Sequence, residues 1–247
     1  MTAKLVHIWR HPIKGIGCEA LVSARLGAGA PLPKDRAWAL LHDNAAADTT
    51  DWQPRRNFLV VASGPQLAPI ASEFISDTAI RLTHPNRPAL DFEPDNDGTR
   101  LIDWIRPLWP EERPAPRRLV PAPDCGMADN GRAQLSVLNL SSLRALSQKI
   151  GQPLDPRRFR GNLWLDGLAP WEEFDLIGKT IRVGAVALRI TDRIERCRAT
   201  EANPETGRRD LDPPRALSTG WGHRDFGVYA DVLNDGDITL NDAVTLQ

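Results

Sequence analysis

Residues 15–36 read GIGCEALVSARLGAGAPLPKDR, and this stretch decides between two fold classes. Its start matches the G-x-G-x-x-[GA] pattern of dinucleotide-binding loops, and Asp35 follows where a ribose ligand is expected. That pattern requires a helix that begins at the glycines, so that its amides face the pyrophosphate. Helix breakers occupy the place of that helix, at Gly27, Gly29, Pro31 and Pro33. The stretch therefore favours short strands and turns over a dinucleotide-binding βαβ unit.

Around this stretch, the first part of the chain alternates polar and apolar residues in the manner of strands. Strands are predicted at residues 4–10, 20–24, 37–41, 58–62 and 80–83. Residues 101–109 predict a short helix that Pro107 interrupts. A stretch rich in proline and arginine follows at 110–118, and we place the domain boundary there, between residues 1–115 and 116–247.

The second part of the chain continues the strand pattern, with predicted strands at 134–138, 162–166, 185–191, 227–233 and 238–240. A helix is predicted from Ser141 or Ser142 to Ile150, because serine can cap its start and Gly151 can end it. The sequence Asn-Asp-Gly at 234–236 is typical of a hairpin turn. Many strands and little helix predict a mainly β (α+β) fold of barrel type.

The composition excludes several classes of function. The chain has 247 residues, of which 41% are hydrophobic, and a net charge of -1. That balance leaves no broad basic field for nucleic acid or a membrane surface, and the arginine-rich stretches at 113–118 and 157–160 lack an aromatic stacking motif. The first residues contain no long apolar run, so we expect no signal peptide, no membrane span and a cytoplasmic location.

Three cysteines are present, Cys18, Cys125 and Cys197, and no two of them have C-x-x-C spacing. This count argues against a disulfide framework and against a zinc or iron–sulfur site built from this chain alone. A G-x-S-x-G elbow, an H-E-x-x-H motif and a P-loop are all absent from the sequence.

Cys197 has the most suggestive surroundings of the three. It lies between Arg196 and Arg198, after a predicted apolar strand and before the turn sequence NPETG at 203–207. Flanking guanidinium groups favour a thiolate, which is both a nucleophile and a soft metal ligand. A cysteine buried at a strand end, with its arginines at the surface, explains the same residues equally well.

Two further groups of residues could contact an anion. Strand alternation over 157–162 would place Arg158, Arg160 and Asn162 on one face, where two guanidinium groups and an amide could hold a phosphate. Lys14 in a glycine loop, together with Arg36, could do the same. A solvated arginine face and an ordinary surface loop remain the simpler explanations when each group is taken alone.

Taken in order, the motifs of the chain resemble one family. They are HPIKG at 11–15, KDRAW at 34–38, LNLSSL at 138–143, RFRGN at 158–162, ERC at 195–197, NPETG at 203–207 and FGVY at 226–229. The chain is similar to MOSC-domain proteins, named after the molybdenum cofactor sulfurase C-terminal domain. This family includes the mitochondrial amidoxime-reducing component and bacterial relatives that reduce N-hydroxylated compounds. The resemblance covers nearly the whole chain, and its specificity lies in the order and combination of the motifs.

The resemblance implies a fold and a set of ligand contacts. It implies an N-terminal MOSC-associated β-barrel-like domain at 1–115, a β-barrel MOSC domain at 116–247, and a molybdenum–molybdopterin cofactor (Moco) between them. Cys197 falls on the molybdenum-ligating cysteine of the family. The positions that contact the pterin or its phosphate are Lys14, Arg36, Arg160, Asn162 and Arg196, with Arg132 in a polar segment that also serves the cofactor.

The resemblance also implies an activity, with one alternative. The protein would be an oxidoreductase that takes an oxygen from N-hydroxylated or N-oxide small molecules. No ferredoxin-like extension follows residue 247, so we expect electrons from a separate ferredoxin, flavoprotein or cytochrome-type partner. The alternative is a carrier or maturation module, in which Cys197 holds a persulfide or the protein passes the cofactor on.

Some residues depart from the pattern of the family. Gly161 stands where the family usually has proline, and Asn203 stands where it usually has aspartate. Gly15 stands where the reductases often have serine, and residues 131–133 do not match the Asp-Thr-Ser run of the amidoxime reducers. These differences are compatible with cofactor binding and leave the substrate open.

Overall fold

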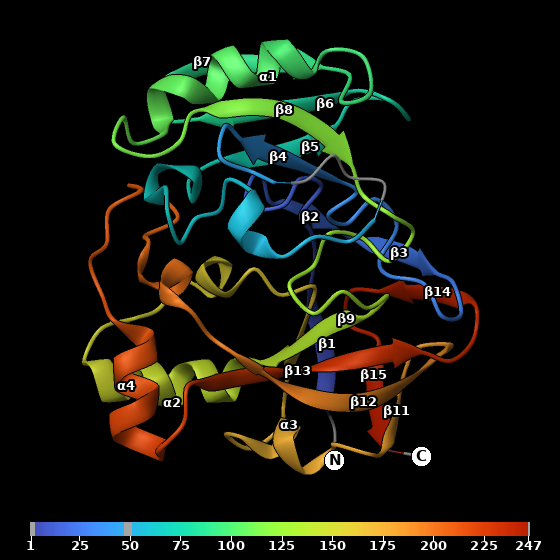
Figure 1. Cartoon of the computed structure of the whole chain (residues 1–247). Coiled ribbons are helices and arrows are strands. Elements are labelled where there is room, and N and C mark those ends of the chain that lie inside the picture. The colour runs from blue at the N-terminus through green and yellow to red at the C-terminus, as the bar shows by residue number, and fades with distance from the viewer. Residues whose placement is uncertain (1–2, 47–50, 247) are drawn as a thin grey trace.

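The computed structural model describes residues 3–46 and 51–246, and its lower half in Figure 1 is a closed barrel. The strand order around the barrel is β10-β9-β13-β12-β11-β15-β1, and pairing of β1 with β10 closes the ring. These strands are β1 (Ala3–Arg10), β9 (Leu135–Asn139), β10 (Leu163–Asp166), β11 (Thr180–Val183), β12 (Val186–Glu195), β13 (Asp225–Val232) and β15 (Ala243–Leu246). β2 (Glu19–Leu21) extends the sheet from β1. The predicted mainly β (α+β) fold is confirmed.

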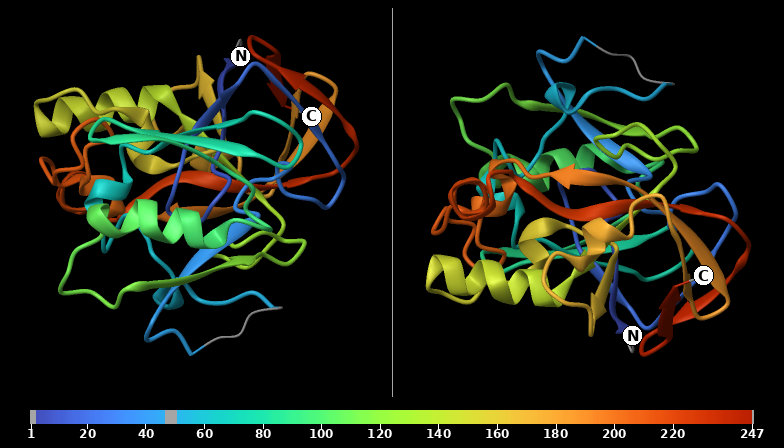
Figure 2. Two further views of the ribbon diagram at one scale, coloured as in Figure 1. Left: turned by 90° about the horizontal axis from the view of Figure 1, so that it is seen from above. Right: turned by 90° about the horizontal axis from the view of Figure 1, so that it is seen from below.

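The barrel is filled by apolar side chains from both ends of the chain. Leu5 and Ile8 of β1 are fully buried against residues such as Val137, Leu188 and Val228. The two termini come close together (Figure 2), because Ala3 pairs with Val244. The first strand of the chain is therefore an integral part of the barrel that later residues build.

The parallel pair β9 and β10 is connected by the helix α2 (Leu140–Ile150). Asn139, not a serine, caps this helix, because its side chain accepts a hydrogen bond from the Ser141 amide at 2.9 Å. Gly151 ends it in the left-handed conformation at φ 80°, as predicted. α2 packs against α4 (Pro213–Trp221), a helix that the sequence analysis missed, and the short helix α3 (Glu172–Asp175) follows β10.

The upper half in Figure 1 holds a second apolar core. It consists of the pair β4 (Trp38–His42) and β8 (Pro116–Pro121) and the sheet β5 (Ala71–Phe74), β6 (Ile80–His84) and β7 (Arg87–Phe92). The helix α1 (Gly98–Ile105) continues into a 3-10 turn at Arg106–Leu108 and covers these strands with Leu101 and Ile105. Leu40, Leu82 and Phe92 are buried beneath it.

Strand pairing couples the two parts of the chain in both directions. β8 follows residue 115 but pairs with β4, and β1 precedes it but closes the later barrel. β3 (Ser23–Leu26) likewise pairs with β14 (Gly236–Thr239), and the two lie side by side in Figure 1. The boundary at 115/116 stays a prediction.

The predicted hairpin at 234–236 and the predicted strand at 58–62 are wrong. The hairpin predicted at 234–236 does not form, because β12 and β9 already occupy both edges of β13, so β14 pairs with β3 instead. Residues 58–62 form no strand: they follow a 3-10 turn at Arg55–Asn57, and only Phe58 makes a bridge, to Leu41.

In the described parts of the chain, helices are too short or too polar to cross a membrane.

Candidate functional site

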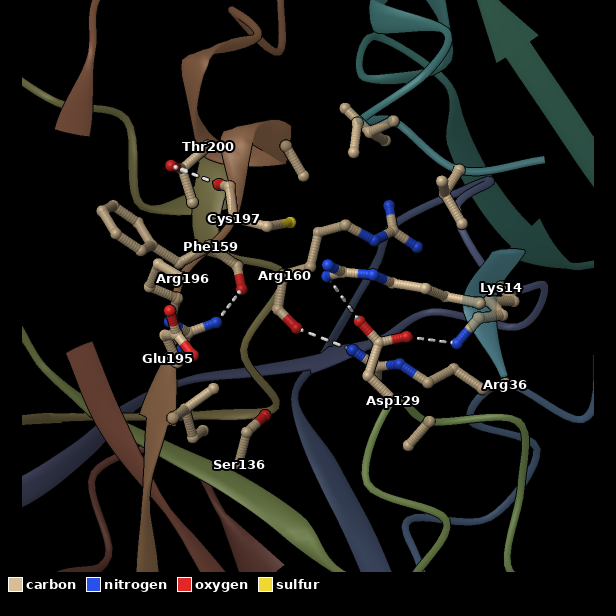
Figure 3. Close-up of a pocket in the computed structure, with 18 of the residues that line it drawn as sticks. Lys14, Arg36, Asp129, Ser136, Phe159, Arg160, Glu195, Arg196, Cys197 and Thr200 are labelled. Atoms are coloured by element: carbon tan, nitrogen blue, oxygen red, sulfur yellow. Dashed lines mark hydrogen bonds and ion pairs between the residues drawn. The ribbon is translucent and has the colours of Figure 1, made fainter. Parts of the chain in front are cut away.

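A cavity of about 230 Å³ lies where the mouth of the barrel meets loops of the first part of the chain (Figure 3). Part of its wall comes from the barrel strands and residues next to them, and the rest comes from loops and 3-10 turns. Lys14 and Arg36 come from loops beside β1 and β4, while Ser136 and Tyr229 come from β9 and β13. Strand ends that converge at one mouth thus bring together residues far apart in sequence.

Cys197 lies two residues after β12 and begins a 3-10 turn at Arg198–Glu201. The Thr200 amide and hydroxyl both donate to its carbonyl oxygen, at 3.2 and 3.1 Å. These bonds hold the backbone so that the partly buried thiol faces the cavity, near the Arg160 side chain in Figure 3. The prediction that Cys197 sits at a strand end is confirmed.

Arg196 is a buried cation at the wall of the cavity. Its Nε donates to the Phe226 carbonyl at 2.7 Å and its Nη1 donates to the Phe159 carbonyl at 2.9 Å. Its Nη2 is shielded from solvent and has no partner among the described residues. Loss of solvation lowers the pKa of Arg196 to about 10, which marks a charge that lacks a full set of partners.

Arg160 reaches the cavity through a backbone conformation that the sequence analysis did not foresee. Residues Pro156–Phe159 form a 3-10 turn, and Arg160 follows it with a left-handed φ of 48°. Its Nη2 is also shielded and without a partner in the described parts of the chain. Loss of solvation and the neighbouring charge of Arg36 lower the pKa of Arg160 to about 10.

The prediction that Arg158, Arg160 and Asn162 share one strand face is wrong, because the 3-10 turn replaces the strand. The buried Arg158 head group instead pairs with both carboxylate oxygens of Asp210, at 2.7 and 2.9 Å, and donates to the Glu201 carbonyl at 3.0 Å. Arg158 therefore holds the turn after Cys197 in place.

Asn162 is buried at the cavity floor, and its amide is mostly used within the protein. Its Oδ1 accepts from the Ser136 amide and hydroxyl, at 3.1 and 2.8 Å, and its Nδ2 donates to the Trp9 carbonyl at 3.1 Å. One amide hydrogen remains for a ligand.

Lys14 is buried, and its ammonium donates to the Met127 carbonyl at 2.6 Å and to Asp129 Oδ1 at 2.5 Å. Burial lowers the pKa of Lys14, although Asp129 opposes the shift. Loss of solvation would raise the pKa of Asp129, but Lys14, Arg55 and Arg36 together lower it. Arg36 pairs with Asp35 and donates to the Arg160 carbonyl at 2.8 Å. Two carboxylates thus offset part of the positive charge around the cavity.

The structure therefore brings six of the seven predicted site residues to one cavity: Lys14, Arg36, Arg160, Asn162, Arg196 and Cys197. Arg132 is not among the lining residues; it is exposed and pairs with Asp192 at 3.3 Å.

Arg55 and Tyr229 also line the cavity and were not among the predicted site residues. Burial raises the pKa of Tyr229, the single tyrosine of the chain. Its place in the FGVY motif was the available signal, whereas Arg55 had none. Within 3–46 and 51–246, no three His, Cys, Asp or Glu side chains gather closely enough to hold a metal ion.

Comparison with known families agrees with this architecture. The MOSC N-terminal beta barrel domain family matches residues 2–103, and the MOSC domain family matches residues 124–245. The chain belongs to the MOSC-domain proteins that carry this N-terminal domain, so the family inferred from the motifs is confirmed.

Two curated relatives match part of the chain. A molybdenum cofactor sulfurase from Anopheles gambiae is 30% identical over 158 residues, which are 56% of this chain and 20% of that protein. A molybdenum cofactor sulfurase from Drosophila willistoni is 33% identical over 107 residues, 42% of this chain and 13% of that protein. The matched region thus spans a fifth or less of these longer relatives. Among solved structures, the YUAD protein from Bacillus subtilis aligns with 99% of this chain and 94% of its own, at 13% identity and a TM-score of 0.46.

Proposed function

We propose that the cavity binds a molybdenum–molybdopterin cofactor, with Cys197 as the ligand from the protein to molybdenum. The protein is then an oxidoreductase that reduces N-hydroxylated or N-oxide compounds. The observation that carries this proposal is the pair of shielded guanidinium nitrogens, Arg160 Nη2 and Arg196 Nη2, that lack partners beside the Cys197 thiol.

The electrostatics of the cavity fit an anionic guest. Lys14, Arg36, Arg55, Arg160 and Arg196 bring positive charge to its walls, and Asp35 and Asp129 neutralise only part of it. Desolvated cations without counterions cost free energy, and a phosphate or another anionic group at the arginines offsets that cost. Guanidinium groups are well suited to this task because they donate two parallel hydrogen bonds to phosphate oxygens.

The position of Cys197 fits a soft metal ligand. Thiolate sulfur prefers soft metal centres, and the backbone of Cys197 is held by Thr200. The bound cofactor supplies two-electron redox chemistry at its metal. The chain itself positions the thiol, neutralises the anionic parts of the cofactor through Arg160 and Arg196, and leaves an amide hydrogen on Asn162 for a polar edge.

The relatives support a role connected with this cofactor, since both are named molybdenum cofactor sulfurases. The reduction of N-oxygenated substrates, the cytoplasmic location and a separate ferredoxin, flavoprotein or cytochrome-type electron donor are parts of the proposal that rest on the family resemblance. The substrate is a small molecule that enters the cavity beside Cys197.

The proposal is tested by metal analysis of the full chain purified from cells that make the cofactor. We expect molybdenum to copurify with the protein and to be largely lost from Cys197→Ser, while Cys125→Ser keeps it and both variants keep the parent circular dichroism spectrum. Reduction of benzamidoxime with an artificial electron donor should follow the metal content. Cys197→Ser protein that retains both metal and turnover contradicts the ligand assignment.

A second candidate function is a carrier or maturation module in which Cys197 holds a persulfide. The names of the two relatives and the partial exposure of the thiol favour it. Metal retention without turnover of any N-oxygenated compound supports this function over the reductase. So does transfer of labelled sulfur from cysteine to Cys197 by an added cysteine desulfurase, which breaks the C–S bond of cysteine, releases alanine and leaves a persulfide on Cys197.

A further inference from the structure

The two arginines that flank Cys197 differ in exposure. Arg196 turns inward and is buried, whereas the side chain of Arg198 is 56% exposed. Arg198 Nη2 lies 3.4 Å from Glu201 Oε2, and its Nε and Nη1 have no other partner among the described residues. Arg198 is therefore a cation next to Cys197 with donors still available to a ligand.

Glu201 does not balance this charge by itself, because a second arginine shares the same oxygen. Arg209 Nε lies 3.7 Å from Glu201 Oε2. One carboxylate thus faces two guanidinium groups, and a positive charge remains. Loss of solvation, together with the like charges of Arg198 and Arg113, lowers the pKa of Arg209. Arg198 and Arg209 together carry more positive charge than Glu201 can neutralise.

This surplus of charge borders the cavity on the side of Cys197. Arg209 Nη2 donates to the Ala62 carbonyl at 2.9 Å, and Ala62 lines the cavity together with Ala199 and Cys197. A negative charge on Cys197 is close enough to raise the pKa of Arg209. A molecule that approaches the thiol therefore experiences the field of both arginines.

The neighbouring Arg158 differs from Arg198 because it has a dedicated counterion. It is buried, and Asp210 pairs with it through both carboxylate oxygens. Arg198 has no such dedicated partner and faces solvent. Arg198, the residue after Cys197, therefore keeps guanidinium donors that its single pair with Glu201 does not use.

We propose that Arg198, with Arg209 offsetting the charge of Glu201, forms an anion site beside Cys197 that selects small substrates carrying a carboxylate group. The inference rests on the proposed function for the identity of the reacting group, an N–O bond. Arg198 binds the carboxylate, while the reducible end of the same molecule enters the cavity. The net charge of -1 on the whole chain makes this a local field and not a general affinity for anions.

A first test does not depend on the cofactor. In cofactor-free full chain, the Cys197 thiolate is alkylated with iodoacetate or with neutral iodoacetamide; in each reaction an S–C bond forms, the C–I bond breaks and iodide leaves. Peptide mass spectrometry separates Cys197 from the other two cysteines. The measured quantity is the ratio of the two rate constants, which reports the field felt by an approaching carboxylate.

We expect Arg198→Gln to lower the ratio about two- to fivefold and Glu201→Gln to raise it by a similar factor, because the two changes shift local charge in opposite directions. Arg25→Gln, at an exposed arginine that pairs with Asp237, is the control for net charge and should leave the ratio unchanged. General loosening of the site would move both variants in the same direction. Equal ratios in all four proteins overturn the proposal.

A second test uses molybdenum-loaded protein and a matched pair of substrates, benzamidoxime and 4-carboxybenzamidoxime. We expect Arg198→Gln to raise KM for the carboxylated compound about three- to tenfold and to leave KM for the neutral compound nearly unchanged. Turnover of neither substrate by loaded parent protein contradicts the reductase function, whereas the alkylation result still decides the anion site. An equal change in KM for both substrates overturns the selection of carboxylates.

Discussion

The buried charge of Arg160 costs free energy through lost solvation, and a bound anion would offset that cost. Its Nη2 has no partner among the described residues, and its pKa is lowered to about 10 by loss of solvation and by Arg36. Replacement by methionine keeps the length of the side chain and removes the charge. We expect Arg160→Met to raise the free energy of unfolding of the cofactor-free protein by about 1 kcal/mol. The same variant should retain much less molybdenum.

Urea unfolding and metal analysis of the same preparations check whether the free energy of unfolding rises while the molybdenum content falls. Arg25→Gln serves as the matched control, because its ion pair with Asp237 is exposed and lies on β3 and β14. A variant that loses stability and keeps its metal contradicts the role of Arg160 as an anion partner.

Gly161, the residue after Arg160, packs so closely against the core that it leaves no room for a side chain. A Cβ atom at residue 161 would lie 2.2 Å from Leu138 Cδ1 and 2.9 Å from Cδ2, and Leu138 is fully buried. We expect Gly161→Ala to lower the free energy of unfolding by about 1–3 kcal/mol, since the core must shift to admit the methyl group. Gly27→Ala is the control, because its Cβ would meet Ala30 at an ordinary 3.7 Å. Chemical denaturation of both variants measures the difference.

At the scale of elements, Glu173 of α3 ties two helices to the barrel from a fully buried position. Its Oε2 accepts from Asn139 Nδ2 at 2.9 Å and from Ser142 Oγ at 2.8 Å, while Oε1 has no partner in the described parts of the chain. Burial raises the pKa of Glu173 above 4.5, and the two hydrogen bonds only partly oppose this. The folded state therefore binds a proton at Glu173 more tightly than the unfolded state does.

The stability that this protonation contributes is fully present below pH 4.5, and it is lost as the pH rises through the raised pKa of the folded protein. We expect Glu173→Gln to lack this loss, so that its free energy of unfolding at pH 8 exceeds that of the parent by about 1 kcal/mol or more. Urea titrations between pH 5 and pH 8 give the comparison, with Asp175→Asn, at an exposed carboxylate of the same helix, as control. A constant difference between parent and Glu173→Gln across this range contradicts the buried proton.

The elements also show which parts of the fold and of the site could be predicted from the sequence. β1, β9 and α2 could be predicted, because strand alternation and a helix-ending glycine are local signals. The 3-10 turn before Arg160 could not, because a left-handed arginine has no signal of its own. Cys197 and its cationic neighbours were found through motif order, whereas Arg55 enters the cavity only through tertiary contacts.

At the scale of the whole molecule, β1 makes the two parts of the chain dependent on each other. It pairs with both β10 and β15, and Leu5 and Ile8 belong to the core of the barrel. We expect a fragment of residues 116–247 to lack a cooperative thermal transition, because the barrel would be open and its core incomplete. The full chain, measured under the same conditions, is the reference.

Calorimetry of the fragment, with and without a synthetic peptide of residues 3–26, checks this dependence. Recovery of a cooperative transition on addition of the peptide agrees with the strand pairing. A fragment that unfolds cooperatively by itself shows instead that residues 116–247 are an autonomous domain.

The closure of the barrel also determines the order in which the strands of the newly made protein can pair. On the ribosome, residues 3–10 emerge early, yet one of their two neighbours in the ring is made of residues 243–246. Until synthesis has passed that point, Ala3 and Lys4 lack their partners in β15, and this part of the β1 edge stays available to other nascent chains. We expect closure of the barrel to be a late and slow step of folding, because it joins strands that are far apart in the sequence.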